Sequence, residues 1–438
     1  MGHWSRRWQR RNREWELAAG LLATCLILAA AASGVAAEFA ASAARASVRA
    51  DDAKRHVAAL ADDALEGRAA GSRGGRAAGA YLVEEFERIG IDPAGNDGGY
   101  YQRFGTMRNV LGMLRGSDPE ASREVVVVGA HYDHVGYGTS ANSYGPTGHI
   151  HNGADDNASG VAGLLEVAEA CTLLPQRPRR TIVFACWDGE EVDLLGSRHF
   201  VRERPLPLSQ HTVAFSINLD MIGRLREQRL EVYGSRSAVG LRRAVVQANL
   251  PTSLNLVFLW EYSEDSDHFP FLAAGVPTLM FHTGLHDEYH RPSDDTHLVN
   301  FTGIEPVASL AFETLLAVAD SHQAPAFRDG CRSESETTRQ QLESEAPPAP
   351  PKRWGLGTRQ DEADPSAPVV VRVSPQTPAA RGGLRLGDRI LAVDRQALTD
   401  QDDMVRQLAN AADEVAITVE RQGRMLDLQL TFATPPAN

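Results

Sequence analysis

The chain has 438 residues and a net charge of −13, and 43% of its residues are hydrophobic. This length allows two or three domains, and the hydrophobic fraction is that of a globular protein. An acidic balance without a basic stripe argues against nucleic acid as the main partner.

The N-terminal segment has the pattern of a signal peptide. Arginines between residues 6 and 13 precede an apolar run over residues 17–32, and Val35-Ala36-Ala37 offers small residues for cleavage. The pattern predicts export to the periplasm or the medium, with residues 1–37 as a cleaved signal peptide or a retained membrane anchor. Beyond it only Cys171, Cys186 and Cys331 remain, which argues against a disulfide framework and leaves one Cys171–Cys186 bond open.

Strand and helix patterns alternate through the first two thirds of the chain. Helical spacing between residues 51 and 91 is broken by glycines at residues 71–75. Strands are predicted at residues 109–114, 124–129, 181–185, 213–219, 230–233, 256–260 and 277–281, and helices at residues 159–172 and 301–319. This alternation predicts an α/β domain over residues 38–325, with a doubly wound, mostly parallel sheet and helices on both faces.

The composition then changes. Residues 326–351 are rich in serine, proline and charge, which predicts a flexible linker. A small β-rich domain is predicted at residues 352–434, with strands at 367–373, 415–419 and 426–432 and a helix at 402–409.

This C-terminal domain resembles a PDZ domain. The resemblance rests on Gly355-Leu356-Gly357 and on Gly383-Leu384 followed by Gly387-Asp388-Arg389-Ile390. It implies a groove that takes the C-terminus of a peptide as an added strand. Residues 358–362 are polar where many PDZ domains are apolar, so a packing or regulatory role without a ligand stays open.

Histidines and carboxylates gather where the predicted strands end. They are His131 and Asp133, Asp155 and Asp156, Glu190 and Glu191, Asp220, and Glu288 and His290. In open α/β sheets ligands bind beyond the carboxyl ends of the strands, so we expect these residues to meet there. Clustered carboxylates repel one another unless a cation neutralises them, and mixed histidine and carboxylate ligands suit zinc.

Residues 51–320 resemble the M28 family of zinc aminopeptidases. The matching elements occur in the family's order and are His131-x-Asp133, the Gly-Ala-Asp-Asp-Asn-Ala-Ser-Gly run at 153–160, Gly189-Glu190-Glu191, Asn218-Leu219-Asp220-Met221 and Tyr289-His290. The resemblance implies two zinc ions, one held by His131, Asp155 and Asp220 and the other by Asp155, Glu191 and His290.

In this assignment Asp155 bridges the ions and its peptide bond to Asp156 is cis. Asp133 accepts a hydrogen bond from the outer nitrogen of His131, and Glu190 acts as general base and acid. The remaining histidines are expected at the surface or behind the ligands, as are Asp156 and Tyr289; they are His134, His149, His151, His268, His282 and His286.

The predicted function is that of an exported di-zinc aminopeptidase, which hydrolyses peptides with a free N-terminus through a metal-bridging water. Residues 137–151 and 255–268 are expected to form its pocket walls. A related carboxypeptidase or glutaminyl cyclase is the alternative, and a carboxypeptidase would need a basic pocket, for which Arg224 and Arg291 are candidates. A peptide-binding scaffold acting through the PDZ-like domain is a further alternative.

Overall fold

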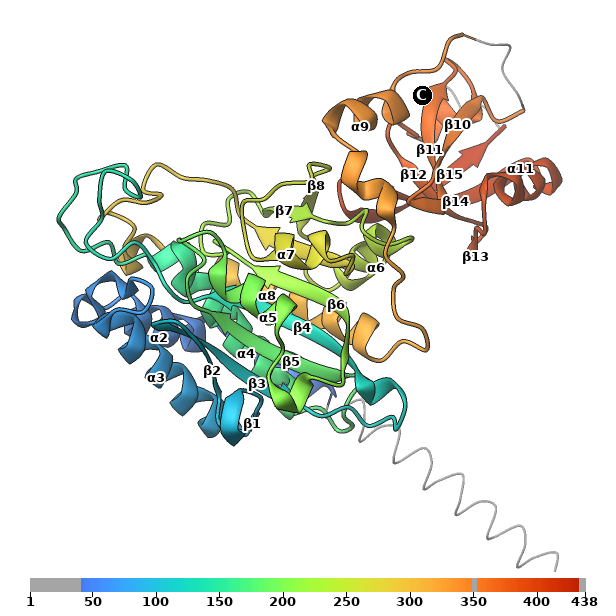
Figure 1. Cartoon of the computed structure of the whole chain (residues 1–438). Helices are drawn as coiled ribbons and strands as arrows, with labels where there is room; N and C mark the ends of the chain where they lie inside the picture. The colour runs from blue at the N-terminus through green and yellow to red at the C-terminus, as the bar shows by residue number, and fades with distance from the viewer. Residues whose placement is uncertain (1–40, 349–352, 433–438) are drawn as a thin grey trace, which may run out of the picture.

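The structure is a computed structural model and describes residues 41–348 and 353–432. The predicted signal peptide or anchor at residues 1–37 lies outside the described residues. The described chain forms a nine-stranded sheet with helices and a separate six-stranded sheet, drawn in orange to red in Figure 1.

The large sheet is parallel at its centre and has both parallel and antiparallel pairs at its flanks. Its strands are β1 (Asp92–Pro93), β2 (Tyr101–Phe104), β3 (Met107–Leu114), β4 (Glu124–His131), β5 (Thr181–Trp187), β6 (Thr212–Leu219), β7 (Arg229–Tyr233), β8 (Asn255–Phe258) and β9 (Thr278–His282). The spatial order is β1-β3-β5-β4-β6-β9-β7-β8, and β2 pairs with β3. Strands β5, β4, β6 and β9 run parallel, so their carboxyl ends share one edge.

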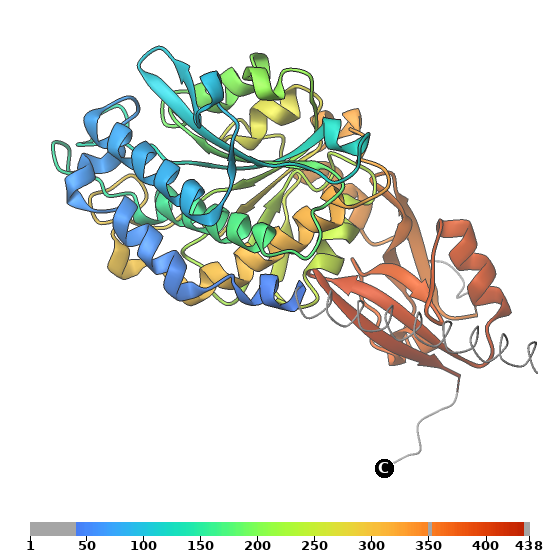
Figure 2. The same ribbon diagram turned by 90° about the horizontal axis from the view of Figure 1, so that it is seen from below.

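Helices cover both faces of this sheet, as Figure 2 shows. They are α2 (Ala50–Leu60), α3 (Arg73–Ile89), α4 (Gly160–Thr172), α5 (Leu195–Arg202), α6 (Leu241–Ala248), α7 (His268–Ala273) and α8 (Phe301–Ala319). Helices α2, α3, α4, α6 and α8 lie on one face, and α5 and α7 lie on the other. The α/β fold with helices on both faces is confirmed.

The valine run of β4 explains why this strand is central. Val126 and Val128 pack into the core beneath α4 and α8, whereas Val125 and Val127 pack with Phe200 of α5 and Phe271 of α7. Side chains alternate across a strand, so a strand covered on both faces is apolar at every position. Burying each valine contributes roughly 1.5–3 kcal/mol, which fixes the position of His131 at the end of the strand.

The segment expected to be a flexible linker carries helical structure. The 3-10 helix η7 (Asp329–Ser333) and helix α9 (Glu336–Glu343) lie within residues 326–351. Ser335 and Thr338 form a capping box at the start of α9, and Glu334 accepts hydrogen bonds from Arg236 and Arg328. The prediction of an extended segment is wrong here, because these charged side chains form ion pairs with the rest of the protein.

The C-terminal domain is a small antiparallel sheet with a long helix across one side. Its elements are β10 (Leu356–Asp361), β11 (Asp364–Val373), α10 (Pro378–Arg381), β12 (Arg389–Val393), β13 (Gln396–Ala397), α11 (Gln401–Asn410), β14 (Glu414–Arg421) and β15 (Arg424–Thr431). Strand β10 is at the edge of the sheet, and a groove of about 240 Å³ runs between it and α11.

Two turns of the C-terminal domain dock on the larger domain. Gly240 donates its backbone N–H to Ala363 in the β10–β11 turn, and Leu256 donates to Gln422 in the β14–β15 turn. A Cβ on Gly423 would lie 2.3 Å from the Leu256 side chain, so this turn needs glycine to approach closely.

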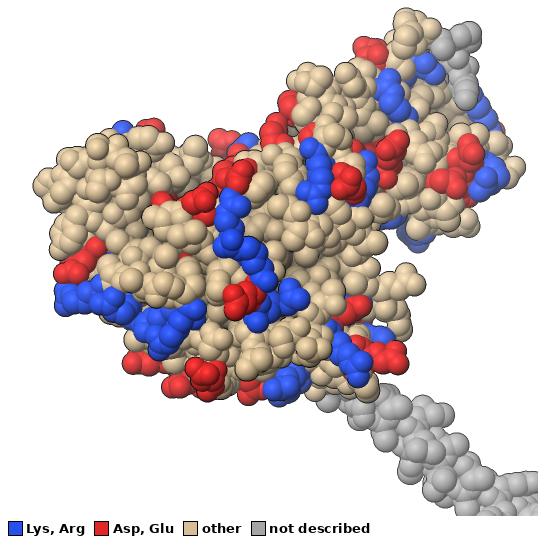
Figure 3. Space-filling view, viewed as in Figure 1, with Lys and Arg blue, Asp and Glu red and all other residues tan. Residues whose placement is uncertain are grey.

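The charges on the visible face are mixed in sign (Figure 3), and the Cys171–Cys186 bond that the sequence left open is not formed. On the face in Figure 3 acidic and basic side chains alternate without a large patch of either sign. Cys171, Cys186 and Cys331 are free and buried, so the described residues contain no disulfide.

Candidate metal centre

The strand-end side chains meet at the carboxyl edge of the parallel strands. His131 is the last residue of β4, while Glu190 and Glu191 follow β5 and Asp220 follows β6. His290 comes from a late loop in which its own φ is 53°. Asp156 lies in the irregular turn η4 (Ala154–Ser159) that precedes α4, where its own backbone is not helical.

Two groups of possible metal ligands occur among the described residues. The first contains His131, Asp156 and Asp220, all buried. His131 Nε2 lies 3.3 Å from Asp156 Oδ1 and 3.5 Å from Asp220 Oδ1. One imidazole thus faces two carboxylates from two other loops.

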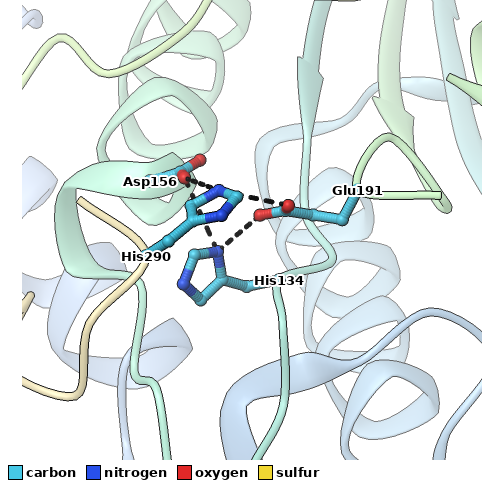
Figure 4. A group of neighbouring side chains, drawn as sticks. All are labelled: His134, Asp156, Glu191 and His290. Atoms are coloured by element: carbon cyan, nitrogen blue, oxygen red, sulfur yellow. Dashed lines mark hydrogen bonds and ion pairs between the residues drawn. The ribbon is translucent and has the colours of Figure 1, made fainter. Parts of the chain in front are cut away.

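The second group contains His134, Asp156, Glu191 and His290 and is drawn in Figure 4. His290 Nε2 lies 3.2 Å from both Asp156 Oδ2 and Glu191 Oε2. His134 Nδ1 lies 2.7 Å from Glu191 Oε1 and 3.7 Å from Asp156 Oδ2. Figure 4 shows the two imidazoles and the two carboxylates facing a common point.

Asp156 joins the two groups, with Oδ1 toward His131 and Oδ2 toward His290. Asp155, the predicted bridge, belongs to neither group. Asp155 Oδ1 accepts hydrogen bonds from Ser159 Oγ and from the backbone N–H of Gly223, and Asp155 Oδ2 lies 3.2 Å from His286 Nε2. The cis peptide bond is likewise at Asp156–Asn157 and not at Asp155–Asp156.

The expected contact between Asp133 and His131 also differs. The carbonyl oxygen of Asp133 lies 3.2 Å from His131 Nδ1, whereas the Asp133 carboxylate is 3.9 Å away. Asp133 Oδ1 instead accepts a hydrogen bond from the backbone N–H of Glu190. The backbone of Asp133 therefore orients His131, and its carboxylate holds the loop that carries Glu190.

Glu190 stands beside the first group without joining it. Its Oε2 lies 3.9 Å from His131 Nε2, and its side chain lines the cavity described below. Burial raises the pKa of Glu190 well above its usual value, since the opposing effect of His131 is smaller. A carboxyl group of raised pKa is suited to accept and return a proton near neutral pH.

His134 is the ligand candidate that sequence reasoning missed. It was expected at the surface or behind the ligands, yet it is buried and part of the second group. A parallel bridge between Ala69 and His134 aligns this residue with a distant segment. The available sequence signal was its place three residues after His131, which puts it in the same strand-end loop.

The chemistry of both groups fits zinc. Burial alone opposes the charged form of His290, but the hydrogen bonds that it donates to the carboxylates of Asp156 and Glu191 raise its pKa to about 10. Asp220 Oδ1 and His134 Nε2 are buried and form no hydrogen bond with the described residues. Imidazole and carboxylate donors converge without thiolate, and this mixed donor set suits zinc.

A cavity of about 330 Å³ opens beside the first group. Tyr144 and Asp265 with Ser266 line it, and they come from the segments expected to form its walls. Further lining residues are Met221, Tyr233, Met280, His282, Leu285 and Tyr289. Arg224 and Arg291 do not line it, because Arg224 pairs with Asp294 and Arg291 donates to the carbonyl of Tyr144.

Comparison with known proteins finds a family match in each of the two domains. Residues 109–315 match the model of peptidase family M28, and residues 354–432 match a PDZ domain. The chain is 25% identical to aminopeptidase YwaD of Bacillus subtilis over 232 residues, which is 50% of this chain and 46% of that protein. It is 29% identical to a glutamate carboxypeptidase 2 homolog of Caenorhabditis elegans over 222 residues, 47% of this chain and 24% of that protein.

Among solved structures, the LapA aminopeptidase of Legionella pneumophila is similar with a TM-score of 0.55 and 17% identity, covering 65% of this chain and 75% of that chain. This similarity concerns the fold. The chain spans less than half the length of these two curated relatives, so their activities do not transfer directly. The residues that carry the candidate metal centre lie within the match to peptidase family M28, and the match to a PDZ domain follows it in the same chain.

Proposed function

We propose that the protein is a zinc-dependent aminopeptidase with two metal ions at its catalytic centre. The observation that carries the proposal is the placement of Asp156, whose two carboxylate oxygens face two separate groups of donors. His131 and Asp220 would complete one zinc site, and His134, Glu191 and His290 the other. When bound, a zinc pair lowers the pKa of water and polarises a carbonyl group.

Glu190 is the proposed general base and acid. It lines the cavity and is held in place through its backbone N–H by Asp133. Because Glu191 already belongs to the second group, Glu190 remains free to accept a proton from the attacking water. It then donates that proton to the leaving nitrogen as the peptide bond breaks.

The lining of the cavity favours a free amino group over a carboxylate. No lysine or arginine is among the cavity-lining residues that the structure describes, and Asp265 is a lining carboxylate outside the proposed zinc sites and the general base. Such a lining offers a partner to a substrate ammonium group and none of the basic side chains that bind a C-terminal carboxylate. This charge distribution is why we propose an aminopeptidase and not the related carboxypeptidase.

Hydrolysis of aminoacyl-nitroanilides with and without a chelator tests this proposal. We expect hydrolysis that a chelator abolishes and added zinc restores. The Glu190→Gln variant should lose at least about a hundredfold in kcat while keeping the wild-type metal content. Absence of chelator-sensitive hydrolysis across a panel of such substrates would refute the proposed activity.

Export is also proposed, on the pattern of arginines, apolar run and small residues before Glu38. Fractionation of cells expressing the full chain, followed by N-terminal sequencing, should place the protein outside the cytoplasm. An N-terminus near Glu38 would indicate cleavage, and an intact segment in the membrane fraction would indicate an anchor. Protein confined to the cytoplasm would contradict export.

For the PDZ domain we propose capture of an extended peptide. The groove beside the edge strand β10 is lined by apolar side chains of Leu356, Met404, Val405 and Leu408. An edge strand offers unpaired backbone groups to an added strand. Titration of the full protein with fluorescent C-terminal peptides should show binding that Leu408→Glu weakens, and equal binding by both proteins would exclude this groove.

A further inference from the structure

Arg68 is a buried guanidinium beside the metal centre that the proposed chemistry does not use. Its exposed fraction is 0%. Within the described residues it donates hydrogen bonds only to backbone carbonyls, and no carboxylate pairs with it directly. A buried charge without a direct ion pair is costly, so its retention calls for an explanation.

The carbonyls that Arg68 binds belong to the loops that carry the ligand candidates. Nε donates to Tyr132 O, between His131 and Asp133, at 2.9 Å. Nη1 donates to Asn152 O at 2.5 Å and to Leu60 O at 2.6 Å, and Nη2 donates to Gly153 O at 3.0 Å. One rigid side chain thereby ties the loop before Asp156 to the loop after β4 and to the end of α2.

The backbone of the same segment holds His134. The N–H of His134 donates to the carbonyl of Arg68, and the N–H of Gly136 donates to the carbonyl of Gly67. A Cβ on Gly67 would lie 2.5 Å from the carbonyl oxygens of Gly136 and His151. This close approach keeps His134 in the second group of donors.

The segment adopts this arrangement against its local preference. Glu66, Gly67 and Arg68 have φ of 53°, 68° and 49° in succession, although two of them are not glycine. Left-handed conformations in such residues persist only where their surroundings enforce them, and they are common at functional sites. The contacts of Arg68 supply that enforcement.

We propose that Arg68 is a positioning residue of the metal centre. It fixes the distance between the loop that carries His134 and the loop that carries Asp156, and it supplies positive charge behind the carboxylates of these loops. The inference rests on the proposed zinc site and assigns the residue that shapes it. Arg68 touches neither substrate nor the ligand side chains through its hydrogen bonds, so it acts through the backbone. Mutation of residues behind metal ligands commonly lowers metal affinity by about 10–100-fold.

Arg180 provides a matched control. It is also buried, with 2% exposure, and its guanidinium donates to the carbonyls of Val318 and Ser321 and pairs with Glu124. It lies just before β5, at the amino end of the parallel strands and away from the donor groups. The variants Arg68→Lys, Arg68→Met, Arg180→Lys and Arg180→Met therefore remove equivalent buried guanidinium groups at the two ends of the sheet.

The experiment measures zinc content, zinc affinity by competition with a chelator, thermal unfolding, and kcat and KM of the full-length variants. We expect both Arg68 variants to bind zinc about 10–100-fold more weakly. Their kcat should fall by a larger factor than their KM changes. Arg68→Lys should retain more affinity than Arg68→Met, because it keeps the charge. The Arg180 variants should unfold at lower temperature with zinc affinity within about twofold of wild type.

Equal zinc affinity in wild type and Arg68 variants would overturn the inference and leave the proposed function intact. Loss of zinc that merely follows loss of stability in both pairs of variants would also overturn it. A wild-type protein that binds no zinc would refute the proposed function as well. If the Arg68 variants do not fold, amide hydrogen exchange of metal-free wild type replaces them. We expect the N–H of His134 to be protected from exchange. Rapid exchange would show that His134 is not held in position before metal binds and would overturn the inference.

Discussion

Asp155 and Asp156 are adjacent, yet their carboxylates point into different surroundings. Asp156 faces the two donor groups, and Asp155 accepts hydrogen bonds from Gly223 and Ser159 behind them. Asp294 Oδ2 accepts the backbone N–H groups of both residues. These hydrogen bonds form a frame that presents only the carboxylate of Asp156 to the two groups of donors.

Away from the centre, folding buries the carboxyl group of Glu166. Its Oε2 accepts the backbone N–H of Arg49 at 2.8 Å, while Oε1 has no hydrogen-bond partner among the described residues. Burial raises the pKa of Glu166 from 4.5 to about 7. Folding therefore binds a proton here that the unfolded chain releases above about pH 4.5.

The sign of this effect gives a prediction. Because the folded state binds the extra proton, the stability that Glu166 contributes falls as pH rises from about 4.5 to about 7. As pH rises through this window, the free energy of unfolding of Glu166→Gln should increase relative to that of wild type by roughly 1 kcal/mol per pH unit. Denaturant unfolding at several pH values measures it, with Glu169→Gln on the same helix as control. A constant difference between the Glu166→Gln variant and wild type would contradict the prediction.

At the scale of elements, the glycines in the first turn of α3 allow close packing. Ser72 caps this helix by accepting the backbone N–H of Gly75. A Cβ on Gly74 would lie only 1.7 Å from the carbonyl oxygen of Leu65 in the 3-10 helix η1 (Asp63–Arg68). The predicted glycine-rich break is therefore a junction that holds the Arg68 segment against α3.

Replacing Gly74 by alanine should destabilise the protein by about 1–3 kcal/mol, because the backbone must move to admit the methyl group. Gly99→Ala is the control, since its Cβ would meet only Asn96 O at 3.6 Å and its φ is −100°. Chemical denaturation measures both variants. Equal stability of the two variants would show that the junction tolerates the added methyl group.

Local sequence patterns predicted most of these elements. The helix at 301–319 coincides with α8, and the valine run of β4 was identified by its apolar composition. The helices η7 and α9 were missed, because ion pairs from Arg236 and Arg328 support that segment. His134 and the choice of Asp156 depend equally on contacts with distant residues, and a single sequence does not display such contacts.

At the scale of the molecule, buried charges join the two domains. Asp361 of β10 lies 2.8 Å from Arg236 Nη1 and 2.7 Å from Arg389 Nη1. The polar segment at 358–362, unusual for a PDZ domain, thus serves the contact with the larger domain. The Arg236 guanidinium also lies 3.6 Å from the centroid of the Trp260 ring. Trp260 is followed along the chain by Asp265 and Ser266, which line the cavity.

Asp361→Asn should therefore weaken the docking of the domains. Removing one partner of a buried ion pair costs about 3–5 kcal/mol, and here it leaves two guanidinium groups facing each other. Calorimetry should show the unfolding transitions of the two domains moving apart. Asp413→Asn is the control, because its pair with Arg353 is 90% exposed at the aspartate. Unchanged transitions in Asp361→Asn would contradict this role.

A zinc-bound crystal structure with anomalous scattering at the zinc edge tests whether Asp156 joins two metal sites. We expect two zinc ions, each contacting a different oxygen of Asp156, with Asp155 outside both sites. A single ion, or two ions bridged by Asp155, would contradict this expectation.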